Sequence, residues 1–166
     1  MLSQFELNLK DQLQDTETYK WHLDDQFFKE VNGAEIERGS VDVTVVAKRM
    51  AERYELSIAY EGTLQVECDR CLEPMQLPVS GEQTLKVKMG EQYDDDGEVV
   101  TISEADGTLN VAWNIYEFLA LEIPLRHVHP DGECLVETLQ ALDTLGAEDQ
   151  LVTDPRWDAL RDLNIE

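Results

Sequence analysis

Short runs in which apolar and polar residues alternate fill the first two-thirds of this chain. In 5-FELNL-9, for example, Phe5, Leu7 and Leu9 are separated by polar neighbours. A period of two places alternate side chains on a buried face and a wet face, as in a β-strand. The runs that we expect to be extended are 5–9, 19–23, 40–47, 55–67 and 74–90.

The connections between these runs indicate the fold class. They are short, with one short helix expected in 24–35, capped by Asp24 or Asp25 and stopped at Gly33. Glu61-Gly62 suggests a bend that divides the run 55–67 into two strands. Parallel βαβ units would need long helical crossovers, which the spacing does not provide. We therefore predict an α+β fold, with an antiparallel meander or open barrel-like sheet in the first two-thirds.

The final third has helical periodicity, and a helix over 113–123 would stop before Pro124. A loop rich in Pro, His and Gly follows and ends at Cys134. We expect one domain over 1–142, with the linker and C-terminal helix in 143–166. The further elements that we expect are a helix over 135–142, a polar linker over 143–150 and a helix over 153–163.

Charge limits the classes of partner. The chain has 36 Asp and Glu against 13 Lys and Arg, a formal net charge of -23. Surfaces that bind nucleic acid neutralise phosphates with clustered cations, and this mean field would repel a polyanion. The acidic balance favours a basic partner or a cationic peptide, and we expect no extensive direct contact with nucleic acid. A local basic patch around Lys48, Arg49 and Arg53 is the alternative.

The first residues, 1-MLSQFELNLK-10, lack the basic and apolar regions of a signal peptide. No apolar run is long enough to span a membrane. We therefore expect a soluble, cytoplasmic protein with no membrane partner.

Cys68 and Cys71 form a Cys-x-x-Cys motif on a turn that leaves an expected strand. Two ligands of a structural zinc site commonly come from such a motif. The stretch 127-HVHPDGEC-134 could supply the other two, because it holds His127, His129 and Cys134. A Cys₃His zinc site from the three cysteines and either histidine is chemically complete.

The cysteine motif is also compatible with packed thiols that bind no metal, or with a redox dithiol. A thioredoxin-like dithiol sits at a helix N-terminus, which lowers the thiol pKa. Here the chain after Cys71 is expected to be extended. We also expect the carboxylates of Glu67, Asp69 and Glu73 to raise the thiol pKa values. The sequence contains no nucleophile elbow, zinc-protease helix or phosphate-binding loop, and thus no identifiable active site.

Three segments in series resemble the YceD family, the large ribosomal RNA subunit accumulation proteins. They are the strand ending 66-VECDRCLEP-74, the segment 121-LEIP-124 leading to a loop that ends in cysteine, and the closing 154-DPRWDALRDL-163. Family members carry more cysteines in the second region, so the resemblance implies that His129 replaces a missing thiol here.

The resemblance implies a non-enzymatic role in the accumulation of large-subunit ribosomal RNA and in ribosome biogenesis. Together with the acidic charge, it leads us to expect a basic ribosomal protein or assembly factor as the partner. No catalytic residues follow from it. Two alternatives are a zinc- or thiol-dependent enzyme that acts on RNA or a ribosome-associated protein, and a generic metal-stabilised interaction domain.

Overall fold

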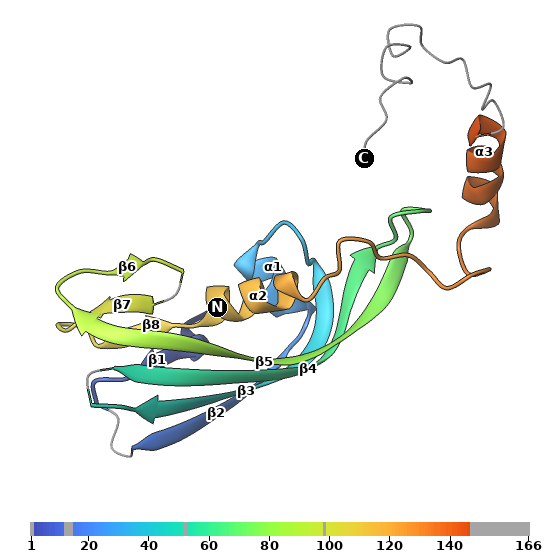
Figure 1. Ribbon diagram of the computed structural model, residues 1–166. Coiled ribbons are helices and arrows are strands. Elements are labelled where there is room, and N and C mark those ends of the chain that lie inside the picture. Colours follow the sequence, from blue (N-terminus) through green and yellow to red (C-terminus); the bar gives the residue numbers. More distant parts are fainter. Residues whose placement is uncertain (1, 12–14, 52, 98, 147–166) are drawn as a thin grey trace, which may run out of the picture.

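The computed structural model describes residues 2–11, 15–51, 53–97 and 99–146 of the chain. A six-stranded open sheet and a two-stranded sheet combine with helices near the C-terminal end (Figure 1), which confirms the predicted α+β class. The elements are a 3-10 helix η1 (Leu2–Phe5), β1 (Glu6–Asn8), β2 (Thr16–Leu23), α1 (Asp25–Val31), β3 (Arg38–Arg49), β4 (Tyr54–Glu67), β5 (Pro74–Gly90), β6 (Asp94–Asp95), β7 (Val99–Ser103), β8 (Thr108–Asn110), α2 (Ala112–Leu121) and α3 (Val136–Gly146).

The large sheet has the strand order β2-β3-β4-β5-β7-β6. Its first four strands are antiparallel neighbours in chain order, as expected for a meander. β7 instead runs parallel to β5, from the pair Lys86 and Val99 to the pair Gly90 and Ser103. β6 lies beyond β7 at the edge of the sheet. After β5 the chain therefore skips one strand position to form β6, and β7 then fills the position between β5 and β6. The sequence did not predict this parallel pair, because it forms without a helical crossover.

The expected bend at Glu61-Gly62 is wrong, since β4 is one continuous strand through both residues. Gly62 pairs with Val41 on β3 and with Val79 on β5. A Cβ atom at Gly62 would lie 2.2 Å from the carbonyl oxygen of Ser40. The glycine therefore marks a close approach of two backbones within the sheet, which is another common reason for glycine in a strand.

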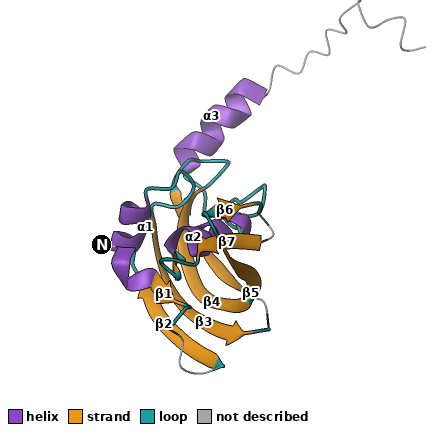
Figure 2. Ribbon diagram, turned by 90° about the vertical axis from the view of Figure 1, so that its left-hand side faces the viewer, coloured by secondary structure: helices purple, strands orange, loops and turns teal. Residues whose placement is uncertain are grey.

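One face of the sheet carries the main core. Val45 on β3 lies opposite Ile58 on β4, and both side chains are buried. Helices α1 and α2 lie on the same face of the sheet (Figure 2), where they bury Phe28 and Ile115. Each fully buried side chain of this size contributes roughly 1.5–3 kcal/mol, so this layer holds the sheet and the helices together.

Helix α1 is capped by a side chain at its start and by a backbone hydrogen bond at its end. The carboxylate of Asp24 accepts the N–H groups of Gln26 at 3.0 Å and Phe27 at 3.2 Å, which makes Asp24 the N-cap. The last helical residue is Val31, and the C-cap is Asn32, which has a left-handed φ of 54° and lies one residue before the expected stop at Gly33. Asparagine tolerates this conformation better than most residues do.

Gly33 does not end α1 but leaves room for a side chain of α2. A Cβ atom there would lie 2.0 Å from the ring of Tyr116, so only glycine lets this ring pass. The Tyr116 hydroxyl accepts the backbone N–H of Glu35 at 2.8 Å and that of Ile36 at 3.1 Å. Tyr116 thereby fixes the segment that leads into β3.

The C-terminal third contains the two expected helices, α2 and α3. Helix α3 continues to Gly146, so the beginning of the expected linker 143–150 is helical. The expected helix over 153–163 lies outside the described residues, and the proposed division at residue 142 stays a prediction. Among the described residues, no helix is long and apolar enough to cross a membrane.

Replacing Tyr116 by phenylalanine should lower the free energy of unfolding by about 1–3 kcal/mol, because it leaves the buried N–H of Ile36 without its acceptor. Urea denaturation measures the change. Tyr93→Phe is the matched control, since Tyr93 is 65% exposed and its variant should unfold with the parent. Equal stability of the Tyr116→Phe and parent proteins would contradict the bracing role of this hydroxyl.

Candidate metal centre

The turn between β4 and β5 forms the tip of a long hairpin. Cross-strand pairing continues to Glu67 opposite Pro74, and the intervening residues make the turn. The Cys68 N–H donates to the carbonyl of Glu73 at 2.9 Å, and the Cys68 carbonyl accepts the Leu72 N–H at 2.8 Å. These bonds fold the Cys-x-x-Cys segment into a compact loop that turns both thiols inward.

The segment after α2 is held against this tip by a reciprocal pair of hydrogen bonds. The Asp69 N–H donates to the carbonyl of His127 at 2.9 Å. The Asp69 carboxylate accepts the His127 N–H at 2.7 Å. An exposed ion pair, Arg70 with Asp131 at 4.0 Å, adds little to this docking. The docking of residue 127 brings the next residues of the segment across the hairpin tip.

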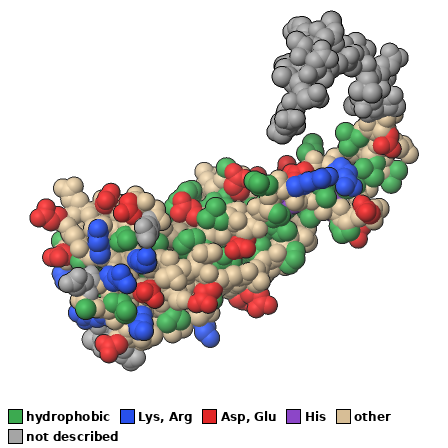
Figure 3. Space-filling view, in the orientation of Figure 1, with side chains coloured by type: hydrophobic (Ala, Val, Ile, Leu, Met, Phe, Trp, Pro, Cys, Tyr) green, Lys and Arg blue, Asp and Glu red, His purple; other side chains and the backbone are tan. Residues whose placement is uncertain are grey.

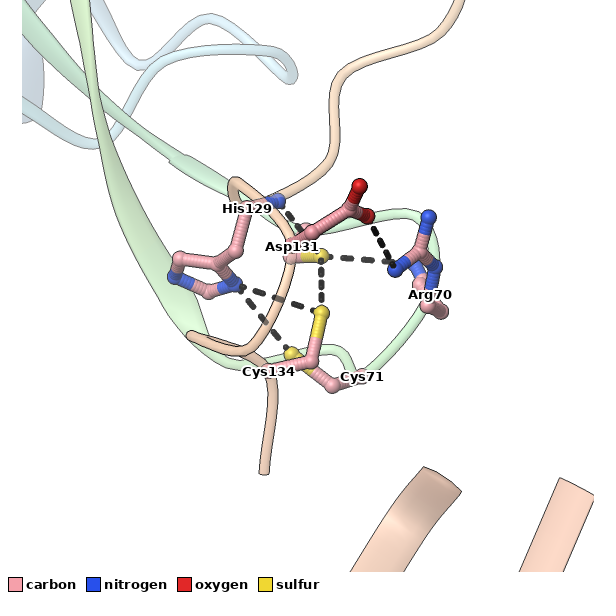
Figure 4. A network of polar contacts seen from close by, with 6 residues as sticks. Arg70, Cys71, His129, Asp131 and Cys134 are labelled. Atoms are coloured by element: carbon pink, nitrogen blue, oxygen red, sulfur yellow. Dashed lines mark hydrogen bonds and ion pairs between the residues drawn. The ribbon is translucent and has the colours of Figure 1, made fainter. Parts of the chain in front are cut away.

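Four side chains meet there, Cys68, Cys71, His129 and Cys134. Their ligand atoms all lie within 4.8 Å of one another. The imidazole of His129 points toward the sulfurs of Cys71 and Cys134 (Figure 4), with Nδ1 at 3.3 Å and 4.0 Å. The sulfurs of Cys68 and Cys134 are 3.9 Å apart. The structure thus brings together the residues that the sequence nominated.

These distances fit a tetrahedral metal ion. Zinc–sulfur bonds of about 2.3 Å place two sulfur ligands about 3.8 Å apart, and a sulfur and an imidazole nitrogen about 3.6 Å apart. The observed separation of the Cys68 and Cys134 sulfurs matches the first value, and the two distances from His129 bracket the second. Thiolate and imidazole ligands are those that structural zinc takes. Zinc at this cluster remains a prediction.

The cluster is a second, small core separate from the main one. All three thiols are at most 5% exposed, which is unusual at the end of a hairpin. Few apolar groups surround them, so burial of hydrocarbon alone offers little stabilisation here. The residues packed against the thiols are Met75, Val128 and Leu139, the last from α3.

Backbone N–H groups lower the pKa of the Cys68 thiol. Burial alone would raise the pKa of the Cys68 thiol, but three N–H donors around its sulfur lower the pKa to about 5. The downward shift favours the thiolate of Cys68, which is the form that binds metal. The donors are the N–H groups of Cys71, Arg70 and His129, the last two at 3.4 Å from the sulfur.

The expectation that neighbouring carboxylates raise the thiol pKa values is wrong for both members of the motif. Burial raises the pKa of Cys71, yet the backbone N–H groups of Leu135 and Glu73 outweigh it and the net shift is downward. Asp69, one of the two acidic residues adjacent to Cys68, instead accepts the N–H of His127 with its carboxylate. The backbone donors of the turn thus dominate over the acidic side chains.

The other two groups of the cluster, Cys134 and His129, both have raised pKa values. Burial and the nearby thiolates raise the pKa of Cys134. Burial lowers the pKa of His129, but its hydrogen bonds to Cys68 and Cys71 outweigh this and raise it. Such a set attracts a cation, which would replace the shared protons. The helix N-terminus typical of a redox dithiol is replaced here by a turn that leads into β5, and the thiols form no disulfide.

The remaining two histidines lie elsewhere. His127, the alternative ligand, is turned back on its own segment, with Nδ1 3.0 Å from the carbonyl of Pro124 and 3.6 Å from Asp69. His22 is an exposed partner of Asp42 on the sheet, 2.8 Å away. The docking role of Asp69 was not predicted from the sequence, although an acidic residue between the two cysteines was a visible signal for docking a second segment.

A comparison with protein families places the chain beside a described family. The family model described as "Large ribosomal RNA subunit accumulation protein YceD" matches residues 56–164, more than half of the chain. This span contains β5, most of β4 and all four residues of the cluster. Neither a curated protein nor a solved structure matches the chain.

We expect metal-replete protein to contain one zinc ion per chain, as measured by elemental analysis. His129→Ala should weaken zinc binding at least tenfold, because loss of even an outer-sphere partner of a metal ligand typically costs about 10–100-fold. His127→Ala is the matched control and should bind zinc as the parent does. Equal losses in the two variants would exclude His129 as the specific ligand.

Removal of the metal should loosen the hairpin tip and leave the sheet intact, since only the tip depends on the small core. Hydrogen exchange after chelation should speed up in 66–75 and 127–139. Amides of β3 and the first half of β4 serve as the internal reference. Unchanged exchange at the tip would show that packed thiols suffice without metal.

Proposed function

The chain belongs to the YceD family, and we propose that it acts in large-subunit ribosomal RNA accumulation as a non-enzymatic factor that binds a basic protein. The observation that carries this proposal is the overlap between the family match and the hairpin tip. In this proposal a structural zinc ion orders the tip so that it can serve as a binding element.

The make-up of the cluster favours binding over catalysis. Catalytic zinc sites use three protein ligands and keep a fourth position for water or substrate, whereas structural sites are closed by four. Cys68, Cys71, His129 and Cys134 would close the coordination of one ion. When bound, zinc would supply cross-linking of β4–β5 to the segment before α3. Burial of the three cysteines would also keep water away from a bound ion.

Charge supports a basic partner. The net charge of -23 attracts cationic proteins and repels naked RNA. On the face in Figure 3, a smaller group of Lys and Arg side chains lies near α3, and most of them gather at the end of the sheet away from α3. Even there Glu55 on β4 lies between Lys48 on β3 and Lys86 on β5, which weakens the patch as a phosphate site.

Affinity purification with mass spectrometry, performed with and without RNase, tests the proposal. We expect basic large-subunit ribosomal proteins or their assembly factors to dominate the capture in both conditions. The Cys134→Ser variant should capture less, because its tip loses a metal ligand. Capture that RNase abolishes would contradict a direct protein partner.

Binding to RNA itself provides the complementary measurement. Isolated large-subunit RNA fragments should bind weakly, with little dependence on salt, because few cations are available to displace counterions. A single-stranded site that neutralises Z phosphates gives a slope of log affinity against log salt of about -0.7Z. Tight binding with a steep slope would favour the basic patch over the protein partner.

A further inference from the structure

An open pocket of about 680 Å³ lies beside the metal cluster. It is lined by the segment that leads into β3, by the hairpin tip and by the segment after α2. Cys68 and His127 belong to both the pocket wall and the docked tip. The shape of the pocket therefore depends on the ordering of the tip.

Leu72 on the rim has no folding role that explains its identity. Its φ of 61° is left-handed, a conformation that glycine adopts freely and leucine does not. Its side chain is 71% exposed, so it gains little from packing. Strain of this kind together with an exposed apolar side chain is typical of a functional position.

The pocket combines apolar walls with unpaired negative charge. Val66, Pro74 and Ile123 line it together with Leu72. Three acidic residues, Glu35, Glu37 and Glu67, also line it, and their side chains make no hydrogen bond or ion pair with other described residues. Arg38 is the one lysine or arginine among the described lining residues.

We propose that this pocket binds an extended Lys- and Arg-rich segment of a partner protein, with one apolar side chain of that segment seated against Leu72. The proposal rests on the proposed function and adds the surface that receives the basic partner. Charge complementarity selects this occupant, and the apolar walls fix its position.

The same charges disfavour the alternative occupants. The chain's own residues 147–166 contain six acidic and two basic residues, so they would meet like charge in the pocket. A second copy of the chain carries the same net charge of -23. Phosphates of RNA would face the carboxylates as well, and like charges juxtaposed at an interface are costly.

A defined peptide tests the pocket. The probe is a fluorescent Lys/Arg-rich synthetic peptide with photoleucine at its centre, and its comparators carry serine at the centre or glutamate in place of the cations. On the full chain we expect binding by anisotropy for the probe alone. The crosslinks should fall in 34–38, 65–74 and 123–127. No binding, or crosslinks elsewhere, would overturn the proposal.

Leu72→Gly separates binding from folding. This variant relieves the left-handed strain, so it should be at least as stable as the parent. It should nevertheless bind the probe about ten- to hundredfold more weakly, as expected for loss of a buried leucine. Leu125→Gly is the matched control, because Leu125 is fully exposed nearby and does not line the pocket. Equal probe binding by Leu72→Gly and the parent would overturn the proposal.

A triple Glu35→Gln, Glu37→Gln, Glu67→Gln variant should also bind the probe more weakly and with a smaller salt dependence. Unchanged salt dependence would overturn the role of these charges in the proposal. If the chain captures no ribosomal protein but still binds the probe in a way that depends on Leu72, only the ribosomal partner is refuted. Equal ribosomal capture by Leu72→Gly and the parent would refute only the pocket.

Discussion

The candidate metal centre and the pocket beside it both depend on one interaction, the joining of the segment 124–134 to the tip of the β4–β5 hairpin. A hairpin tip is normally a polar, exposed turn, yet here it buries three thiols around an imidazole. Buried thiolates are stable only if a cation or a set of donors compensates them. Backbone N–H groups of the turn supply part of that compensation at Cys68, and a metal ion would supply the rest.

This junction connects the main core with the candidate binding surface. The sheet and the helices α1 and α2 pack without help from the cysteines. The tip, by contrast, places Leu72 and the pocket walls, and Leu139 ties α3 to the same small core. A metal site that orders a surface rather than the whole domain is consistent with a factor that acts by binding. The excess of carboxylates then favours a basic partner.

Local patterns in the sequence were sufficient for the four strands of the meander, β2 to β5, but not for the short strands β6, β7 and β8. Alternation indicated the strands of the meander, because one face of each is covered by the core. The cysteine motif and the loop with Cys134 indicated the cluster, but their spacing alone could not choose between His127 and His129. That choice depends on Asp69, whose hydrogen bonds to residue 127 turn His127 away. The parallel β5–β7 pair and the role of Gly62 depend on contacts between distant segments, which no local pattern encodes.

We predict that four protein ligands at the hairpin tip coordinate one zinc ion. X-ray absorption spectroscopy at the zinc edge of metal-replete protein tests this prediction directly. We expect a shell of three sulfurs at about 2.3 Å and one nitrogen at about 2.0–2.1 Å. A shell dominated by oxygen or nitrogen, or one with a water in place of a protein ligand, would contradict a closed Cys₃His site.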